Sequence, residues 1–147
     1  MLRRAPLTAF VASARPARAK RFYRDTLGLR LVSEDRFALV FDCKGVQLRI
    51  QKVGELEPHP FTALGWTVPA IRRRVAAFGK RGVAFERYPF LEQDDLGVWH
   101  APSGAKVAWF KDPDGNLLSL TEAPPSGRRR GATASASPAG SSARRGR

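Results

Sequence analysis

The chain has 147 residues, enough for one ordinary domain and a short extension. Its single cysteine, Cys43, excludes an internal disulfide and a cysteine-rich metal cluster. No apolar run approaches the roughly 20 residues needed to cross a bilayer, and no signal segment follows the first residues. We therefore expect a cytoplasmic protein with no membrane partner.

The last 22 residues differ in composition from the rest. Residues 126–147 contain only Ser, Gly, Ala, Pro, Thr and Arg, so they offer no large apolar side chain to offset the entropy of ordering. Six of the 26 basic residues and none of the 13 acids lie there, which leaves a formal charge of +7 on residues 1–125, out of +13 in total. The sequence predicts a disordered basic tail. Because it lacks interleaved aromatic residues or a reader module, we expect no specific nucleic-acid partner.

The first half of the chain predicts a strand, a helix and three more strands. Pro16 suits the first turn of a helix, and Gly28 suits the position just after its end. Apolar residues recur at helical spacing between these two positions. The expected strands are 7–12, 30–34, 36–42 and 46–52.

The second half repeats this order of elements. Pro69 opens a helix that ends at Gly82, and strands are expected at 62–68, 83–87, 105–111 and 116–121. The two prolines are 53 residues apart, whereas the turn glycines Gly45 and Gly115 are 70 apart. An insertion between 87 and 105 accounts for the difference.

Two βαβββ units, at about 6–53 and 61–122, therefore make up a single domain over residues 1–125. Each unit places one helix on a small sheet, so the fold class is α+β. We expect two curved mixed sheets around a cup-shaped cleft, with the helices on the outside.

Two short motifs accompany the repeat. They are Phe-Tyr-Arg-Asp-Thr-Leu-Gly-Leu at 22–29 and the turn sequence Asp-Pro-Asp-Gly-Asn at 112–116. Together with the repeat, they resemble the vicinal oxygen chelate superfamily of glyoxalases, bleomycin resistance proteins and extradiol dioxygenases, over about residues 6–122. The resemblance implies the fold above and a homodimer. Fold alone does not determine the chemistry.

The resemblance also implies where a metal would bind. Metal-dependent members use His, Gln or Glu on the first and last strands of each unit, and the matching positions are Thr8, Arg49, Ala63 and Ser119. Alanine has no donor atom, the two hydroxyls are neutral, and Arg49 has no lone pair to give. His59 and His100 lie elsewhere in the sequence. We therefore predict no metal site and no cofactor.

The last strand of the first unit suggests a different kind of site. Gln47, Arg49 and Gln51 alternate with apolar residues, so they share one face. The resemblance places Thr8, Phe10, Ser119 and Thr121 across the cup from them. A guanidinium among such donors suits a carboxylate, a phosphate or a polar heteroaromatic ligand. Alternatively, Arg49 pairs with an acid such as Glu86, or this face is exposed to solvent and binds no ligand.

The insertion adds aromatic residues with three possible uses. Trp99 and His100 are expected to wall or cover a ligand, to form a satellite core, or to make a dimer contact. Asp94 and Asp95 with His100 suggest acid–base chemistry only weakly, because a loop sequence fixes no geometry. By strand alternation, Trp66 is expected to pack under a helix.

These expectations favour a small-molecule binding protein of the glyoxalase/bleomycin-resistance type, without a catalytic metal. The expected partner is a small anionic or polar aromatic ligand, held by Thr8, Phe10, Gln47, Arg49, Gln51, Trp99, His100, Ser119 and Thr121. The alternative is an enzyme of this fold, a lyase, isomerase or dioxygenase, with an atypical metal set or metal-free acid–base chemistry. The sequence does not decide between them and identifies no catalytic residue.

Overall fold

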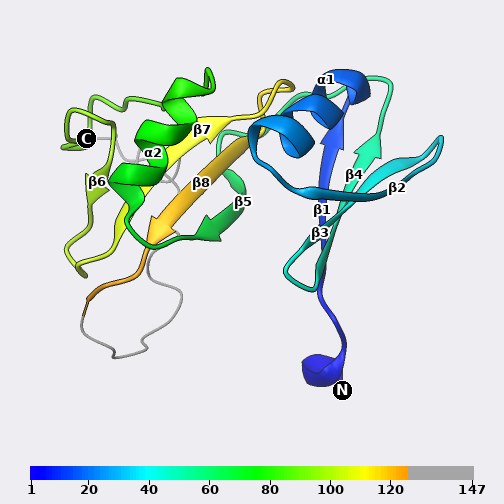
Figure 1. Ribbon diagram of the computed structural model, residues 1–147, viewed down its shortest axis with the longest axis horizontal. Coiled ribbons are helices and arrows are strands. Elements are labelled where there is room, and N and C mark those ends of the chain that lie inside the picture. The colour runs from blue at the N-terminus through cyan, green and yellow to red at the C-terminus, as the bar shows by residue number, and fades with distance from the viewer. Residues whose placement is uncertain (126–147) are drawn as a thin grey trace, which may run out of the picture. The chain divides into compact units, whose positions relative to one another are not determined.

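The computed structural model describes residues 1–125 and confirms the predicted α+β class (Figure 1). The chain forms two compact units. The first holds Met1–Pro58 and Asp112–Gly115, and the second holds His59–Lys111 and the residues from Asn116 onward. The predicted tail, 126–147, lies outside the described residues.

The first unit is a four-stranded mixed sheet with a helix on one face. A 3₁₀ turn at Leu2–Arg4 precedes the strands, whose order in the sheet is β1-β4-β3-β2. Strand β1 runs parallel to β4, and the other neighbours are antiparallel. The elements are β1 (Thr8–Ser13), α1 (Pro16–Arg21), a π-helical turn (Phe22–Thr26), β2 (Arg30–Glu34), β3 (Ala38–Cys43) and β4 (Val46–Lys52).

The helix of the first unit follows the sequence signals. Pro16 occupies its first turn, and Gly28 leaves the helical segment with a φ of 77°. Ala19 and Tyr23 lie completely buried on one side of this segment. They face the apolar side of the sheet, whose buried residues include Leu39, Phe41, Leu48 and Ile50.

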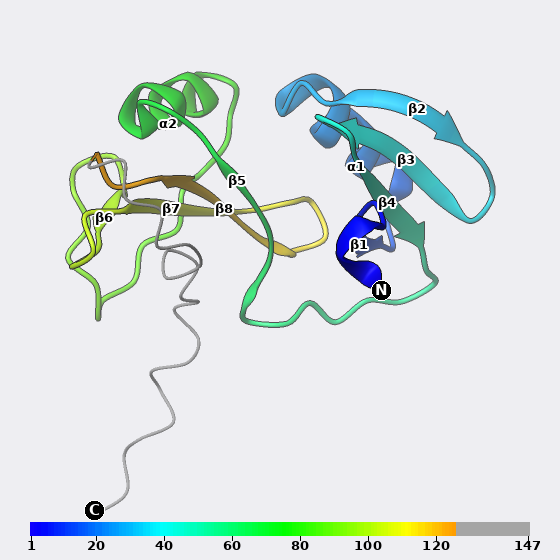
Figure 2. The same cartoon turned by 90° about the horizontal axis from the view of Figure 1, so that it is seen from below.

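The second unit repeats the topology of the first. Its sheet order is β5-β8-β7-β6, with β5 parallel to β8. As in the first unit, the first strand lies beside the last, followed by the third and then the second. The helix again covers one face of its own sheet (Figure 2). The elements are β5 (Thr62–Thr67), α2 (Ile71–Lys80), β6 (Trp99–His100), β7 (Lys106–Lys111) and β8 (Leu117–Glu122). None of the helices within residues 1–125 is long and apolar enough to cross a membrane.

The predicted strand at 83–87 is wrong. Phe85 makes only a single bridge, to Phe110, and the short strand β6 inside the insertion takes the place of the unit's second strand. The Gln93 side chain bonds backbone groups within and beside this segment. Its Oε1 accepts from the amide of Tyr88 at 2.7 Å, and its Nε2 donates to the carbonyl oxygens of Glu86 and Gly97 at 2.9 and 2.8 Å. These backbone groups are thus satisfied without a strand partner.

The turn between β7 and β8 belongs to the first unit. The buried hydroxyl of Tyr23 donates to Asp112 Oδ2 at 2.7 Å. The Asp114 carboxylate accepts from Ser13 Oγ at 2.5 Å and from the amide of Ala14 at 2.8 Å. The Asp-Pro-Asp-Gly-Asn motif therefore supplies hydrogen bonds to residues that precede it by 89 to 101 positions in the sequence.

Candidate functional site

The face of the first sheet opposite α1 carries the candidate ligand residues of the first unit. Thr8 is paired with Gln47, and Phe10 with Arg49, in the parallel ladder of β1 and β4. Gln51 lies two residues further along β4 on the same face. The structure thus brings five of the predicted site residues together: Thr8, Phe10, Gln47, Arg49 and Gln51.

Arg49 occupies the centre of this face. Its neighbours across the two ladders are Phe10 and Val40. The Phe10 side chain is 58% exposed, which is unusual for a phenylalanine on a sheet, whereas Arg49 is partly buried. Arg49 is therefore the strand neighbour of an exposed phenylalanine on one side and of a buried valine on the other.

The charge of Arg49 has no ion-pair partner recorded within residues 1–125. The positive charge of Arg49 acts on the pKa of the Asp35 carboxyl group. Hydrogen bonds from the amides of Phe37 and Ala38 hold the pKa of Asp35 below its ordinary value, with smaller contributions from Arg49 and Lys52. The expected alternative, an ion pair between Arg49 and Glu86, is not among the recorded pairs.

The positions that correspond to the superfamily's metal ligands do not fit a metal. The register places Phe10 opposite Arg49 and Gly65 opposite Ser119, so the paired neighbours add no ligand. Across residues 1–125, no three His, Cys, Asp or Glu side chains gather closely enough to hold an ion. Neutral hydroxyls are weak ligands for a divalent cation, and a guanidinium cannot coordinate one.

The matching face of the second sheet is packed. Ser119 is buried, with Gly65 on one side and Trp109 on the other. A Cβ atom added to Gly65 would collide with Ser119 Oγ. The indole of Trp109 is 1% exposed and donates to Thr62 Oγ1 at 3.2 Å. Ser119 therefore lies against side chains of its own sheet.

The insertion covers this packed face. Ring centroids of Tyr88 and Trp99 lie 5.8 and 6.0 Å from that of Trp109. Of the three predicted uses of Trp99, the structure shows a satellite core. That core consists of Val107, Trp109 and Leu117 with Tyr88, Leu91 and Trp99 packed against it.

His100 lies on the other side of its strand from Trp99. It pairs with Lys106, while Trp99 pairs with Val107, the neighbour of Thr121. The exposed His100 Nε2 lies 3.4 Å from Asp94 Oδ2. Trp99 and His100 thus do not form one wall.

Asp94 anchors the insertion to α2. Burial raises the pKa of Asp94, but hydrogen bonds from the amides of Val98 and Leu96 and from Arg72 and His100 outweigh it and leave the pKa below its ordinary value. Arg72 binds Asp94 and also reaches Asp95 at 3.0 Å. The acid–base set suggested by the sequence is thus engaged in holding a loop. The sequence gives no sign of the role of Gln93, and it leaves the role of Trp109 ambiguous. The alternation of Val107 and Trp109 in the expected strand is the signal that could have revealed the latter.

A separate hollow of about 650 Å³ lies at the end of β8 in the second unit. No predicted site residue lines it. Its charged residues, Lys106 and Glu122, neutralise each other at 3.2 Å. With apolar walls of Val68, Pro69 and Pro125, it offers no unpaired charge to a ligand.

Comparisons with known proteins agree with this architecture. The family model of the Glyoxalase/Bleomycin resistance protein/Dioxygenase superfamily matches residues 7–120. A glyoxalase family protein from Bacillus anthracis has a TM-score of 0.66 at 18% identity, covering 82% of this chain and 95% of its own. A superfamily member from Sphaerobacter thermophilus DSM 20745 also has a TM-score of 0.66, at 21% identity, covering 83% and 99%.

A lactoylglutathione lyase from Agrobacterium tumefaciens has a TM-score of 0.65 at 17% identity, covering 81% of this chain and 93% of its own. No curated protein matches the sequence. At these identities the solved structures bear on the fold alone. The family match spans most of the chain and both βαβββ units. The chain therefore belongs to the glyoxalase/bleomycin resistance protein/dioxygenase superfamily.

Proposed function

We propose that this protein binds an organic small molecule on the open face of its first sheet, without a catalytic metal. The observation that carries the proposal is the guanidinium of Arg49 beside the exposed ring of Phe10. The exposed amides of Gln47 and Gln51 flank Arg49 along β4. In small-molecule sites, polar side chains of these types orient the ligand by hydrogen bonds, while apolar side chains bury its surface.

The chemistry of this face favours an aromatic carboxylate. A guanidinium presents a planar fork that matches a carboxylate, and the bond is strengthened by charge. The exposed Phe10 supplies apolar contact on one side of Arg49, whereas its other neighbour, Val40, is buried. The glutamines and Thr8 add donors and acceptors for polar ring substituents.

Two observations support a site without a metal. The four positions where the superfamily places metal ligands hold Thr8, Arg49, Ala63 and Ser119, none of which suits a divalent ion. In the second unit, the corresponding face is filled by the insertion and Trp109. The proposal therefore assigns ligand contact to the first sheet, and we assign Trp99 and Ser119 to packing.

Thermal shift with benzoate, salicylate and nicotinate, each with and without Mn²⁺, Ni²⁺ or Zn²⁺, tests this proposal. A bound ligand at 100 times its Kd stabilises the folded protein by about 2.7 kcal/mol. We expect a metal-independent rise in Tm that Arg49→Gln removes. Arg36→Gln is the matched control, because Arg36 stacks on Phe37 in the β2–β3 turn.

Stabilisation by metal ions alone, or turnover of a substrate that chelators abolish, would contradict the metal-free proposal. Equal ligand-induced shifts in Arg49→Gln and Arg36→Gln would contradict the assigned site. A homodimer and a cytoplasmic location remain predictions within this proposal. Sedimentation velocity of the purified protein measures the first, and fractionation of cells that express it measures the second.

A further inference from the structure

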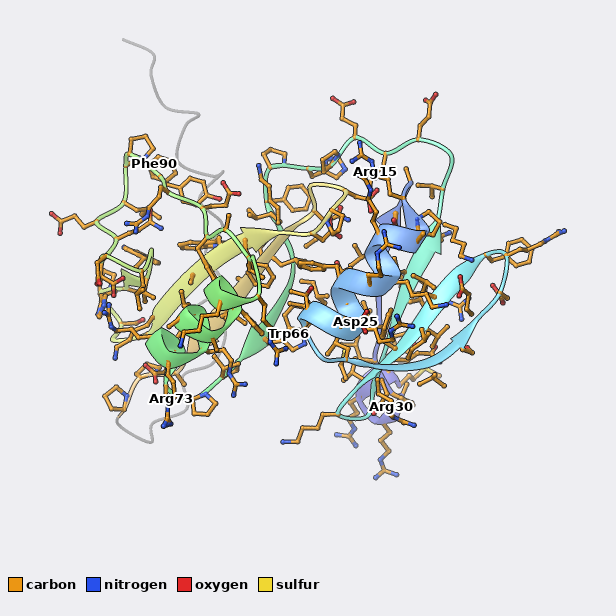
Figure 3. The ribbon with its side chains drawn as sticks, turned by 45° about the horizontal axis from the view of Figure 1, so that its top comes forward. Arg15, Asp25, Arg30, Trp66, Arg73 and Phe90 are labelled. Carbon is orange, nitrogen blue, oxygen red and sulfur yellow. The ribbon has the colours of Figure 1, made fainter. Side chains whose placement is uncertain are left out.

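The outer side of the helical segment in the first unit is strongly basic. Between residues 14 and 33 the sequence has six basic residues and a single acid, Asp25. The segment buries Ala19 and Tyr23 against the sheet, whereas Arg15, Arg18, Arg21 and Arg24 are exposed. Arg15 and Asp25 mark the two ends of this segment in Figure 3.

Neighbouring acids leave three of these charges unpaired. Asp25 forms a two-pronged contact with Arg24, at 2.8 and 3.1 Å. Glu34 is held between Lys20 and Lys52, at 2.8 and 2.9 Å. No ion pair of Arg15, Arg18 or Arg21 is recorded within residues 1–125. These three arginines, the α1 arginines, form a free positive row.

The α2 helix differs in this respect. Its Arg72 is bound by Asp94 and Asp95 of the insertion. Arg73, Arg74 and Lys80 are exposed and have no recorded ion pair in the described part of the chain. The α2 helix thus offers an equal number of free charges at another place on the protein.

The spacing of the α1 arginines fits an extended polyanion better than a single phosphate. Arg15 is the N-cap of α1, and Arg18 and Arg21 follow at intervals of three residues, so the three charges are spread over about 9 Å along the segment. Arginine binds phosphate oxygens through a planar fork. A membrane surface fits less well, because an interfacial helix needs a free apolar face. Here that face is buried against the sheet.

We propose that the α1 arginines bind the phosphate backbone of nucleic acid, without sequence preference. The proposal is independent of the ligand site on the opposite face of the same sheet. It concerns residues within the described fold, and the six arginines of 126–147 add to the same attraction by charge alone.

Fluorescence anisotropy with a labelled 20-base-pair DNA duplex, measured over a series of salt concentrations, tests the proposal. The full chain is compared with Arg15→Gln/Arg18→Gln/Arg21→Gln and with the matched control Arg73→Gln/Arg74→Gln/Lys80→Gln. Each variant loses three positive charges. Because each phosphate contact contributes about 0.9 to the slope of log K against log salt, the α1 variant should lose about 2.7. The α2 variant should lose less than about 1.

Equal losses in the two variants would show that only net charge matters and would overturn the proposal. So would an unchanged slope in the α1 variant, or failure of the full chain to bind the duplex in 50 mM salt. Binding to phosphatidylserine vesicles but not to the duplex would overturn it in favour of a membrane surface. Unchanged Tm values of both variants establish that the fold is retained.

Discussion

Ser119 occupies the position where the superfamily's metal-dependent members place a ligand, but its surroundings are those of a core residue. It is 5% exposed and lies opposite Gly65, whose missing side chain makes room for its hydroxyl. Trp109 borders it on the other side. The backbone of β5 at Gly65 thus packs directly against the Ser119 side chain of β8.

The fit predicts a specific energetic coupling. Gly65→Ala should lower the free energy of unfolding by about 1–3 kcal/mol, because the new Cβ would collide with Ser119 Oγ. Ser119→Ala should relieve most of this loss, since it removes the colliding atom. Urea denaturation of both single variants and the double variant measures the coupling. Additive losses would mean that Gly65 is needed for another reason. Gly79→Ala is the control, because a Cβ at Gly79 meets no atom within 4 Å.

A second residue-scale contact is the hydrogen bond from Tyr23 to Asp112. Tyr23→Phe should destabilise the protein by about 1–3 kcal/mol, because a buried carboxylate loses a donor. Burial and the charge of Asp112 raise the pKa of Tyr23 well above 10.0. The stability that this tyrosine contributes is therefore present below pH 10 and lost as the pH rises toward the folded-state pKa. Denaturation curves from pH 8 to 11 should show a steeper decline in the native protein than in Tyr23→Phe. The same decline in both would contradict the assignment.

At the scale of elements, the Gln93 side chain joins separate parts of the insertion. Gln93 satisfies three backbone groups, those of Tyr88, Glu86 and Gly97. Gln93→Ala should therefore loosen the covering over Trp109. We expect faster hydrogen exchange at the amide of Tyr88, which donates to Gln93, and a red shift in tryptophan fluorescence. Glu92→Ala is the matched control, because its exposed side chain has no recorded hydrogen bond among the described residues. Equal exchange rates in the two variants would contradict this role.

The same element shows how far the sequence could predict the fold. Alternation and turn residues were sufficient to place seven of the strands, because those strands depend on local period and on glycines with positive φ. The strand expected at 83–87 is reduced to one bridge, and the Glu86 carbonyl within it accepts from the Gln93 side chain in place of a strand neighbour. A side chain that replaces a strand neighbour leaves no periodic signal. For the same reason, the pairing of Tyr23 with Asp112, 89 residues apart, was not predictable from either motif alone.

The candidate site shows the same division. The shared face of Gln47, Arg49 and Gln51 follows from strand alternation, which is a local property. The position of Phe10 opposite Arg49 depends on the parallel register of β1 and β4, which is not a local property. The family pattern instead assigned Thr8 to the position of the first-strand metal ligand. Tyr88 and Trp99 cover the second sheet through tertiary packing of a loop, and the sequence alone left three uses of Trp99 open.

At the scale of the whole molecule, the first compact unit is built from two separate stretches of the chain. Residues Asp112–Gly115 belong to the first unit, although they lie between two strands of the second. They give the first unit the partners of Tyr23, Ser13 and Ala14. The first βαβββ segment is therefore incomplete on its own, despite having all four strands of its sheet.

This arrangement predicts that residues 1–58 alone will not reproduce the folded first unit. Without Asp112 and Asp114, the buried hydroxyl of Tyr23 and the hydroxyl of Ser13 lose the acceptors that they have in the full chain. The fragment should lack cooperative melting by circular dichroism, whereas the full chain should melt in one transition. Adding Asp112→Asn and Asp114→Asn to the full chain isolates the contribution of the turn, and these changes should destabilise the whole molecule. A fragment that melts cooperatively near the Tm of the full chain would mean that the sheet and α1 suffice, and that the turn motif contributes little to the first unit.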